Sequence, residues 1–289
     1  MSSIKRSTKQ ELKNLKVRPS KELGQNFVIE PYVIDEIINC GDFNPNESII
    51  EIGPGLGALT GELAKAQQLH LIEIEPNFAT ELSQRFPHID IITGDVRKVD
   101  FSRFGPGPHV VFGNLPYSFS TDILFHLIEQ RKVVSRATLL LQKEFAERVA
   151  APPGSRTYGV LSIMVQLWGT VDLGTVIPGD AFHPAARVDS QILTIRFLTE
   201  PKIAPELIDL FGQVVRLSFL QRRKKIFNSL SRCGHFDEDL LRESFVEAGV
   251  SPDSRAEAFS IKDFELLTAA LKKRIILPTD LSDPVDSVS

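Results

Sequence analysis

Short apolar runs alternate with helical patterns from residue 48 to about residue 197. The runs are rich in isoleucine, leucine and valine, which is typical of buried strands. The expected strands are 48–53, 69–75, 89–93, 109–113, 136–142, 170–177 and 188–197, and the expected helices are 59–67, 76–86, 121–130, 145–150 and 159–168. Continuous apolar strands separated by helices indicate an α/β fold with a doubly wound, mostly parallel sheet.

A change of pattern near residue 200 divides the chain of 289 residues. After Pro201 and Pro205 the apolar residues follow a helical period with little strand character. We therefore expect an α/β domain over 21–200 and a small all-helical domain over 201–275. Residues 1–20 are predicted to form a basic, flexible tail and residues 276–289 an acidic, flexible tail.

The composition disfavours several classes of protein. Cys40 and Cys233 are the only cysteines and lie far apart, which disfavours a disulfide framework or a zinc site and fits the reducing cytoplasm. The histidines are scattered, so we expect no metal. We find no apolar run long enough to span a membrane and no signal-peptide pattern, and we expect no membrane partner.

The charges are unevenly distributed. The net charge of −4 disfavours a nucleic-acid partner, but residues 1–20 carry six basic side chains and one acidic one, and residues 216–225 carry five basic side chains and no acid. Such local patches attract a phosphate backbone whatever the overall charge. The alternative is a solvated face, with bases that pair with acids such as those at 237–239. The candidate RNA contacts are Arg216, Arg222, Arg223, Lys224 and Lys225, followed by Arg148 and Arg156 near the loop 151–159.

A glycine-rich loop, EIGPGLGALT at 51–60, joins the first expected strand to the first helix. Gly53, Gly55 and Gly57 allow a tight turn and a close approach of the main chain to a ligand. Dinucleotide-binding folds use similar loops, so the loop alone does not identify the ligand. Glu51 in the strand and Pro54 in the turn favour S-adenosylmethionine, which has no phosphate, over a dinucleotide.

Two carboxylates follow the next two expected strands. Glu73 or Glu75 ends the second strand, about 20 residues after Gly53, where an acceptor for ribose hydroxyls is expected, and we favour Glu73. Asp95 follows the third strand and can accept a hydrogen bond from an adenine amine. Because ligands of open α/β sheets bind at the carboxyl ends of the strands, the loop and the two acids predict one cofactor site.

The sequence GNLPY at 113–117 follows the fourth expected strand and opens into the same crevice. An ordinary turn after a strand is the plainer interpretation. Methyl transfer to an adenine amine needs acceptors for its hydrogens, because the nitrogen lone pair is delocalised into the ring. The Asn114 side-chain oxygen and the Leu115 carbonyl are the candidate acceptors, and Pro116 fixes the turn. Tyr117 can stack on a base that has been flipped out.

Several motifs in a fixed order resemble the KsgA family, the small-subunit ribosomal RNA adenine dimethyltransferases. The resemblance runs from about residue 21 to about residue 271 and rests on LGQNF, EIGPGLGALT, IEIE, GDV, GNLPYSFS, QKEFAERVAAPPGSRTYGVLSI, FHPAARVDS, SFLQRRKKIFNSL and RAEAFSIKDFELL. It implies a Rossmann-like, S-adenosylmethionine-dependent methyltransferase domain followed by a helical domain that binds RNA or the ribosome. The family places two methyl groups on each of two adjacent adenosines near the 3′ end of that RNA.

The resemblance also implies roles for individual residues. Asn114 would lie between cofactor and target base, and Phe182 would stack on the base opposite Tyr117. Two positions depart from the family pattern: Val28 replaces a leucine, and Ala185 replaces a proline, which loosens the loop next to Phe182. The residues implied to bind the cofactor are Asn26, Val28 through its backbone, Gly53, Gly55, Glu73, Asp95 and Asn114.

The leading hypothesis is a cytoplasmic, monomeric enzyme of ribosome assembly that dimethylates adenosines of small-subunit RNA. The first alternative is the related type of enzyme that methylates large-subunit RNA and confers macrolide resistance. The second is a largely non-catalytic assembly factor or nucleic-acid-binding protein on the same fold, against which the intact set at 114–117 argues. A nucleotide-dependent dehydrogenase leaves GNLPY and the motif around Asn26 unexplained.

Overall fold

A computed structural model describes residues 3–17, 19 and 25–274. The chain divides into two compact units, which we describe separately. The first holds the described residues up to Pro152 together with Leu161–Pro201, and the second holds Pro153–Val160 and the described residues from Lys202 onward. The division at residue 201 lies one residue from the expected boundary, but the loop segment 153–160, which we expected in the first domain, packs with the second unit. The expected acidic tail at 276–289 lies outside the described residues.

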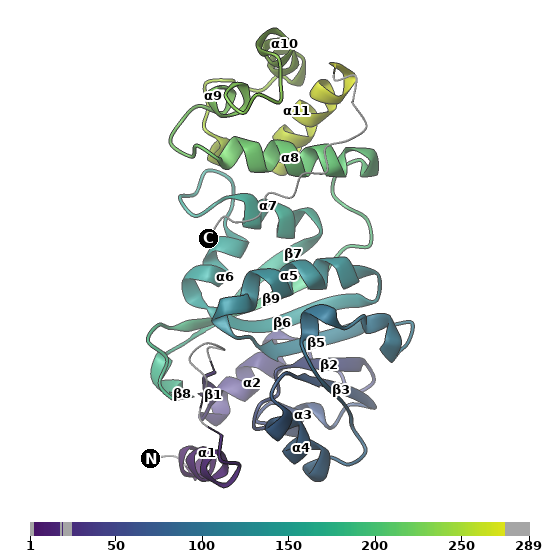
Figure 1. Ribbon diagram of the computed structural model, residues 1–289, viewed down its shortest axis with the longest axis vertical. Coiled ribbons are helices and arrows are strands. Elements are labelled where there is room, and N and C mark those ends of the chain that lie inside the picture. The colour runs from purple at the N-terminus through teal and green to yellow at the C-terminus, as the bar shows by residue number, and fades with distance from the viewer. Residues whose placement is uncertain (1–2, 18, 20–24, 275–289) are drawn as a thin grey trace. The chain divides into compact units, whose positions relative to one another are not determined.

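A seven-stranded sheet forms the centre of the first unit (Figure 1). The strands are, in order across the sheet, β4 (Asp90–Thr93), β3 (Gln68–Glu73), β2 (Ser48–Ile52), β5 (His109–Asn114), β6 (Val134–Gln142), β9 (Ser190–Phe197) and β7 (Gly169–Ile177). The pairs from β4 to β6 are parallel, and β9 is antiparallel to both β6 and β7. The prediction of a doubly wound, mostly parallel sheet is confirmed.

The order of the strands in the sheet changes direction at β2. β2 pairs with β3 on one side and with β5 on the other, so the loops after β2, β3 and β5 leave the sheet at one edge. Gly113 allows the close pairing at this point, because a Cβ there would lie 2.9 Å from the carbonyl oxygen of Ile52. Open α/β sheets bind ligands where the strand order reverses in this way.

Helices cover the sheet, and all except α2 and α3 begin and end within two residues of the expected positions. They are α2 (Pro31–Cys40), α3 (Thr60–Leu63), α4 (Pro76–Arg85), α5 (Ser120–Glu129), α6 (Lys143–Ala150) and α7 (Val160–Leu167). α4 begins at a proline, and the preceding Glu75 side chain accepts a hydrogen bond from the Asn77 main chain. α3 is shorter than expected, because the chain turns toward β3 and the Gln67 N–H donates to the Pro45 carbonyl oxygen at 2.8 Å. Among the described helices none is long and apolar enough to cross a membrane.

The N-terminal segment differs from the expected flexible tail. Residues 3–14 form α1 (Ser3–Asn14), and its Leu12 is buried against Leu56 and Phe78. Burial of this apolar side chain stabilises the packing of α1 against the first unit, which its basic composition did not suggest. Further along, β1 (Phe27–Val28) pairs antiparallel with β8 (Phe182–His183) in a separate two-stranded sheet.

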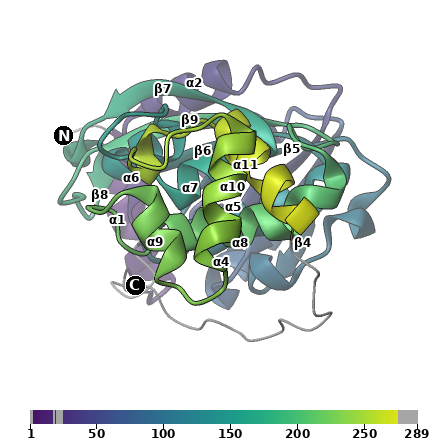
Figure 2. The ribbon, with the colours of Figure 1, turned by 90° about the horizontal axis from the view of Figure 1, so that it is seen from above.

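The second unit is helical, with α8 (Ile208–Phe219), α9 (Ile226–Ser231), α10 (Glu238–Ala248) and α11 (Ile261–Arg274) (Figure 2). Buried aromatic rings form its core: Phe264 lies edge-on to Phe211, with ring centroids 6.2 Å apart, and packs against Phe259 at 5.3 Å. α10 is capped by the Asp237 carboxylate at its start and by Gly249, with φ +66°, at its end. The basic stretch 222–225 lies in the turn between α8 and α9 rather than on a helix.

Candidate active site

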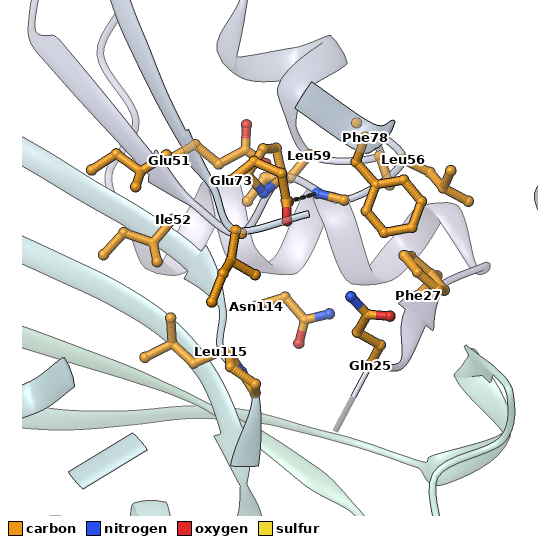
Figure 3. Close-up of a pocket in the computed structure, with 18 of the residues that line it drawn as sticks. Gln25, Phe27, Glu51, Ile52, Leu56, Leu59, Glu73, Phe78, Asn114 and Leu115 are labelled. Carbon is orange, nitrogen blue, oxygen red and sulfur yellow. Dashed lines mark hydrogen bonds between the residues drawn. The ribbon is translucent and has the colours of Figure 1, made fainter. Parts of the chain in front are cut away.

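The glycine-rich loop after β2 forms one wall of a cavity of about 350 Å³ (Figure 3). Gly53 and Gly55 have φ values of +67° and +55°, which residues with a Cβ rarely adopt. The Gly55 N–H donates to Oε2 of Glu73 at 2.9 Å, and the Gly53 N–H donates to the Ile72 carbonyl oxygen at 2.9 Å. A Cβ on Gly55 would lie 3.0 Å from the ring of Phe27, so glycine at this position lets that ring pack against the loop.

Glu73, at the end of β3, lies in the second wall of the cavity. Its Oε2 accepts from Gly55 and its Oε1 accepts from the Glu75 N–H at 2.9 Å. Burial raises the pKa of Glu73, and these main-chain hydrogen bonds oppose the rise. The carboxylate is therefore held rigidly, with acceptor positions left for ligand hydroxyl groups. Of the two acids considered in this motif, the structure places Glu73 in the cavity.

Glu51, which favoured S-adenosylmethionine in the sequence without being assigned a contact, also lines the cavity. Its carboxyl group is buried in β2, and the Thr60 hydroxyl donates to its Oε2 at 2.7 Å. Burial raises the pKa of Glu51 to about 8, against the effect of the Thr60 hydrogen bond. The side chain is therefore mostly protonated at pH 7, so it adds a hydrogen-bond donor to the cavity and no charge.

Asp95 follows β4 and lies in a third wall of the cavity, bound to Arg97. Nη2 of Arg97 donates to Oδ2 of Asp95 at 2.7 Å, and Nε lies 3.0 Å from Oδ1 and 3.1 Å from Oδ2. The side-chain hydrogen bond from Arg97 lowers the pKa of Asp95. Asp95 is therefore an ionised acceptor, as its expected role toward an amine requires.

Asn114 ends β5 and faces the same cavity (Figure 3). Its Nδ2 donates to the main-chain oxygen of Asn26 at 2.9 Å. Because a carbonyl oxygen only accepts, this bond fixes which end of the amide is which and leaves Oδ1 as the acceptor end. The next residue, Leu115, is held by a hydrogen bond from its N–H to the Leu140 carbonyl oxygen at 3.2 Å, and Pro116 follows at the cavity wall.

The predicted residues that the cavity brings together come from five separate stretches of the chain. These residues are Asn26, Val28, Gly53, Gly55, Glu73, Asp95, Asn114, Leu115 and Pro116. Sequence reasoning missed Thr8 and Glu11 of α1, and also Arg97 and Phe119. Of these, Arg97 carried a signal, since a basic residue two positions after an expected ligand acid is a natural partner for it.

Two predicted base-stacking residues do not join this set. The side chain of Tyr117 lies outside the part of the chain that the structure describes, so its stacking role stays a prediction. The stacking role of Phe182 stays a prediction as well: its ring is only 1% exposed and packs in the apolar core with residues such as Val28 and Ile177. Phe182 also pairs with Val28 of β1, so stacking on a base would require the ring to leave this core.

The predicted RNA contacts separate into paired and exposed side chains. Arg222 donates to the carbonyl oxygens of Arg156 and Tyr158, at 3.0 and 2.7 Å, and Lys225 donates to Asp253 at 2.8 Å. Arg222 and Lys225 therefore have partners within the protein, but these partners are not the acids at 237–239 that we considered. The side chains of Arg216, Arg223 and Lys224 are exposed. Arg156 is also exposed, and Arg148, in the first unit, is exposed with its guanidinium 5.1 Å from the ring centroid of Phe145.

Metal ligands were not expected, and the described residues contain no group of three or more histidine, cysteine, aspartate or glutamate side chains that could hold a metal ion.

Comparison with known proteins identifies the relatives of this chain. A profile of the ribosomal RNA adenine dimethylase family matches residues 17–273. Ribosomal RNA small subunit methyltransferase A of Syntrophotalea carbinolica is 36% identical over 262 residues, which cover 90% of this chain and 99% of the relative. The protein of the same name from Bacillus cytotoxicus is 39% identical over 266 residues, or 87% and 90% of the two chains.

Solved structures agree with these relatives. A dimethyladenosine transferase from Plasmodium falciparum superposes with a TM-score of 0.73 at 26% identity, over 86% of this chain and 98% of its own. The 23S rRNA methyltransferase ErmE gives a TM-score of 0.69 at 25% identity, over 86% and 100%. Since the profile spans nearly all the described chain and the relatives match along almost their whole length, the chain belongs to the ribosomal RNA adenine dimethylase family of S-adenosylmethionine-dependent methyltransferases.

Proposed function

We propose that this enzyme transfers two methyl groups to the exocyclic amine of each of two adjacent adenosines near the 3′ end of small-subunit ribosomal RNA during ribosome assembly. The observation that carries the proposal is the placement of Asn114: its amide is oriented by Asn26 and lies in one cavity with Glu73 and Asp95. The names of the relatives favour the small subunit as the source of the RNA.

The cavity residues fit S-adenosylmethionine. The volume of the cavity, about 350 Å³, lies within the usual range of about 300–1,000 Å³ for small-molecule sites. Gly53 and Gly55 would let the main chain approach the ligand, Glu73 would accept from the ribose hydroxyls, and Asp95 would accept from the adenine amine. Asn26 and the backbone of Val28 would complete the site. The bound cofactor supplies a methyl group on a sulfonium, which is a strong electrophile.

The residues after β5 would hold the target amine. Oδ1 of Asn114 and the carbonyl oxygen of Leu115 accept its two hydrogens and draw the nitrogen toward tetrahedral geometry, which frees its lone pair for attack. Pro116 keeps the Leu115 carbonyl in place, and Tyr117 stacks on the flipped base. The nitrogen loses a proton to solvent after the new bond forms, so no side chain has to act as a strong base. Positioning supplies most of the rate enhancement.

The proposed setting is the cytoplasm, where small subunits are assembled. A monomer suffices for the chemistry, because the residues assigned to cofactor and target amine come from one chain. Arg216, Arg223 and Lys224 are the strongest candidates for phosphate contacts, because their charged ends are exposed. Arg148 and Arg156 remain candidates. Arg222 and Lys225 act first within the second unit, through the partners described above.

One experiment tests the substrate. Undermethylated small subunits, and separately large-subunit RNA, are incubated with the enzyme and labelled S-adenosylmethionine, and the RNA is digested to nucleosides. We expect dimethyladenosine from the small subunits alone. Label in large-subunit RNA alone would replace this proposal with the macrolide-resistance activity, and no label in either RNA would favour a non-catalytic assembly factor.

Replacing Asn114 tests the amine-holding site. We expect Asn114→Ala to lower the rate of methyl transfer by at least roughly a hundredfold, because the target nitrogen loses an acceptor in the transition state. The dissociation constant of the cofactor, measured by calorimetry, should stay within about tenfold. Asn46→Ala, at an exposed position on another edge of the sheet, is the control. Full activity of Asn114→Ala would refute the role of this residue.

A further inference from the structure

Arg97 connects three elements of the first unit. It lies in the 3-10 turn Val96–Lys98, after β4. Its guanidinium binds Asp95 in this turn, and Nη1 donates to Oδ2 of Asp122 in α5 at 2.9 Å. The same group lies 4.5 Å from the ring centroid of Phe119, the last residue of the turn that follows Pro116. One side chain therefore spans the turn of the cofactor acid, the start of α5 and the loop after β5.

Toward Asp95, the contacts of Arg97 leave room for one ligand donor. The Nε and Nη2 bonds run side by side, and the Arg97 main-chain N–H donates to Oδ1 at 3.0 Å. A carboxylate offers about four acceptor positions, so these three donors leave about one. Such a parallel fork fixes the carboxylate plane, which a lysine, with its single charged nitrogen, cannot do.

On its other side, Arg97 reaches the segment that follows the target-binding motif. Phe119 and Arg97 both line the cavity, and Phe119 lies three residues after Pro116. The face of an aromatic ring attracts a guanidinium, and the Asp122 carboxylate holds the far end of that guanidinium. The side chains of Arg97 and Asp95 are 32% and 20% exposed, so water screens these charges only in part.

We propose that Arg97 is a positioning residue that sets Asp95 for the cofactor adenine and, through Phe119 and Asp122, anchors the loop that holds the target amine. The inference rests on the proposed function for the identity of the two ligands. It predicts that a substitution of Arg97 disturbs both cofactor binding and methyl transfer. Removing only the contact between Arg97 and Asp122 of α5 should disturb methyl transfer alone.

Calorimetry with S-adenosylmethionine tests the first link. We expect Arg97→Ala to raise the dissociation constant of the cofactor roughly tenfold, because Asp95 loses its fixed orientation. Arg97→Lys keeps the charge but loses the fork, so it should still weaken binding. Arg103→Ala, an exposed arginine of the next 3-10 turn (Phe101–Phe104), is the matched control and should bind as the wild type does. Thermal unfolding checks that every variant is folded.

Asp122→Asn tests the second link. It weakens the contact with α5 and leaves the Asp95 fork intact, so the cofactor dissociation constant should be unchanged while kcat falls by up to about fivefold. Phe119→Leu, which removes the ring face that attracts Arg97, should also lower kcat. Equal effects on cofactor binding from Asp122→Asn and Arg97→Ala would contradict the separation of the two links.

The outcome is distinguishable from a failure of the proposed function. If wild-type enzyme methylates small subunits while Arg97→Ala binds cofactor and turns over normally, the role of Arg97 is wrong and the proposed function stands. If wild-type enzyme binds cofactor but methylates no ribosomal RNA, the proposed function fails, and the calorimetric comparison still decides the link between Arg97 and Asp95.

Discussion

At the scale of single residues, the cavity contains acids in different protonation states. Asp95 is held ionised by Arg97, whereas burial raises the pKa of Glu51 to about 8. Glu51 sits in the middle of the sheet, where a charge would lie among apolar strands, and only Thr60 donates to its carboxyl oxygen within hydrogen-bond distance among the described contacts. Of these two acids, Asp95 therefore carries a charge, which Arg97 balances, whereas Glu51 adds none.

Glu51 makes the stability of the fold depend on pH. Its pKa in the folded chain, about 8, lies above the ordinary value of 4.5, so the folded state holds a proton that the unfolded state releases. The contribution of Glu51 to the free energy of unfolding is fully present below pH 4.5 and is lost as the pH rises to about 8. We expect Glu51→Gln, which cannot titrate, to exceed the wild type in free energy of unfolding by up to about 3 kcal/mol at pH 7.

Chemical denaturation at a series of pH values measures this difference. The gap between Glu51→Gln and the wild type should widen from pH 5 to pH 8. Glu62→Gln changes a partly exposed glutamate of α3 and should leave the pH profile as it is. A constant gap across the series would show that Glu51 is already ionised in the folded chain.

At the scale of elements, the strongest local patterns predicted the structure best. β2, β3, β4 and β5 lie within one or two residues of the expected strands. The central strands β2 and β5 are buried along nearly their whole length, and such strands are recognised by their apolar runs. The glycine loop, Glu73 and Asp95 were predictable from their places at the ends of these strands. The pair β1–β8 was not, since a two-residue strand shows no periodicity.

Side-chain partners were harder to predict than elements. The resemblance placed Phe182 on a base, but the contact that decides its position comes from β1, more than 150 residues away in the chain. The partners of the basic stretch 222–225 were equally hard to predict. The carbonyl oxygens that bind Arg222 belong to the segment 153–160, and its place in the second unit depends on tertiary packing. The packing of α1 through Leu12 was likewise not predictable, because the basic residues around Leu12 suggested a solvated tail.

The burial of Phe182 gives a prediction at this scale. Phe182→Leu should cost about 1–2 kcal/mol in free energy of unfolding and Phe182→Ala about 3–5 kcal/mol, because the ring fills the core beneath the β1–β8 pair. Phe182→Leu should keep methyl transfer within about threefold of the wild type, once folding is allowed for. A Leu variant with wild-type stability and a severe loss of activity would instead support the base-stacking role.

At the scale of the whole molecule, net charge gives little information about RNA binding. The chain carries a net charge of −4, yet the exposed side chains of Arg216, Arg223 and Lys224 lie close together in the sequence of the second unit. Several other bases of this unit form ion pairs with carboxylates, so their charges are partly neutralised locally. Pairs of this kind are Lys225 with Asp253, Lys262 with Glu265 and Lys273 with Glu247.

This difference between exposed and paired bases predicts the salt dependence of RNA binding. Replacing Arg216, Arg223 and Lys224 by alanine should weaken binding to small subunits and reduce the slope of log affinity against log salt by up to about 2–3, one step for each lost phosphate contact. The control triple Lys225→Ala, Lys262→Ala and Lys273→Ala removes the same charge from the same unit, but from residues that already have partners. Its slope should stay close to that of the wild type. If both triples reduce the slope equally, RNA responds to the overall charge of the unit, and the exposed bases make no contacts of their own.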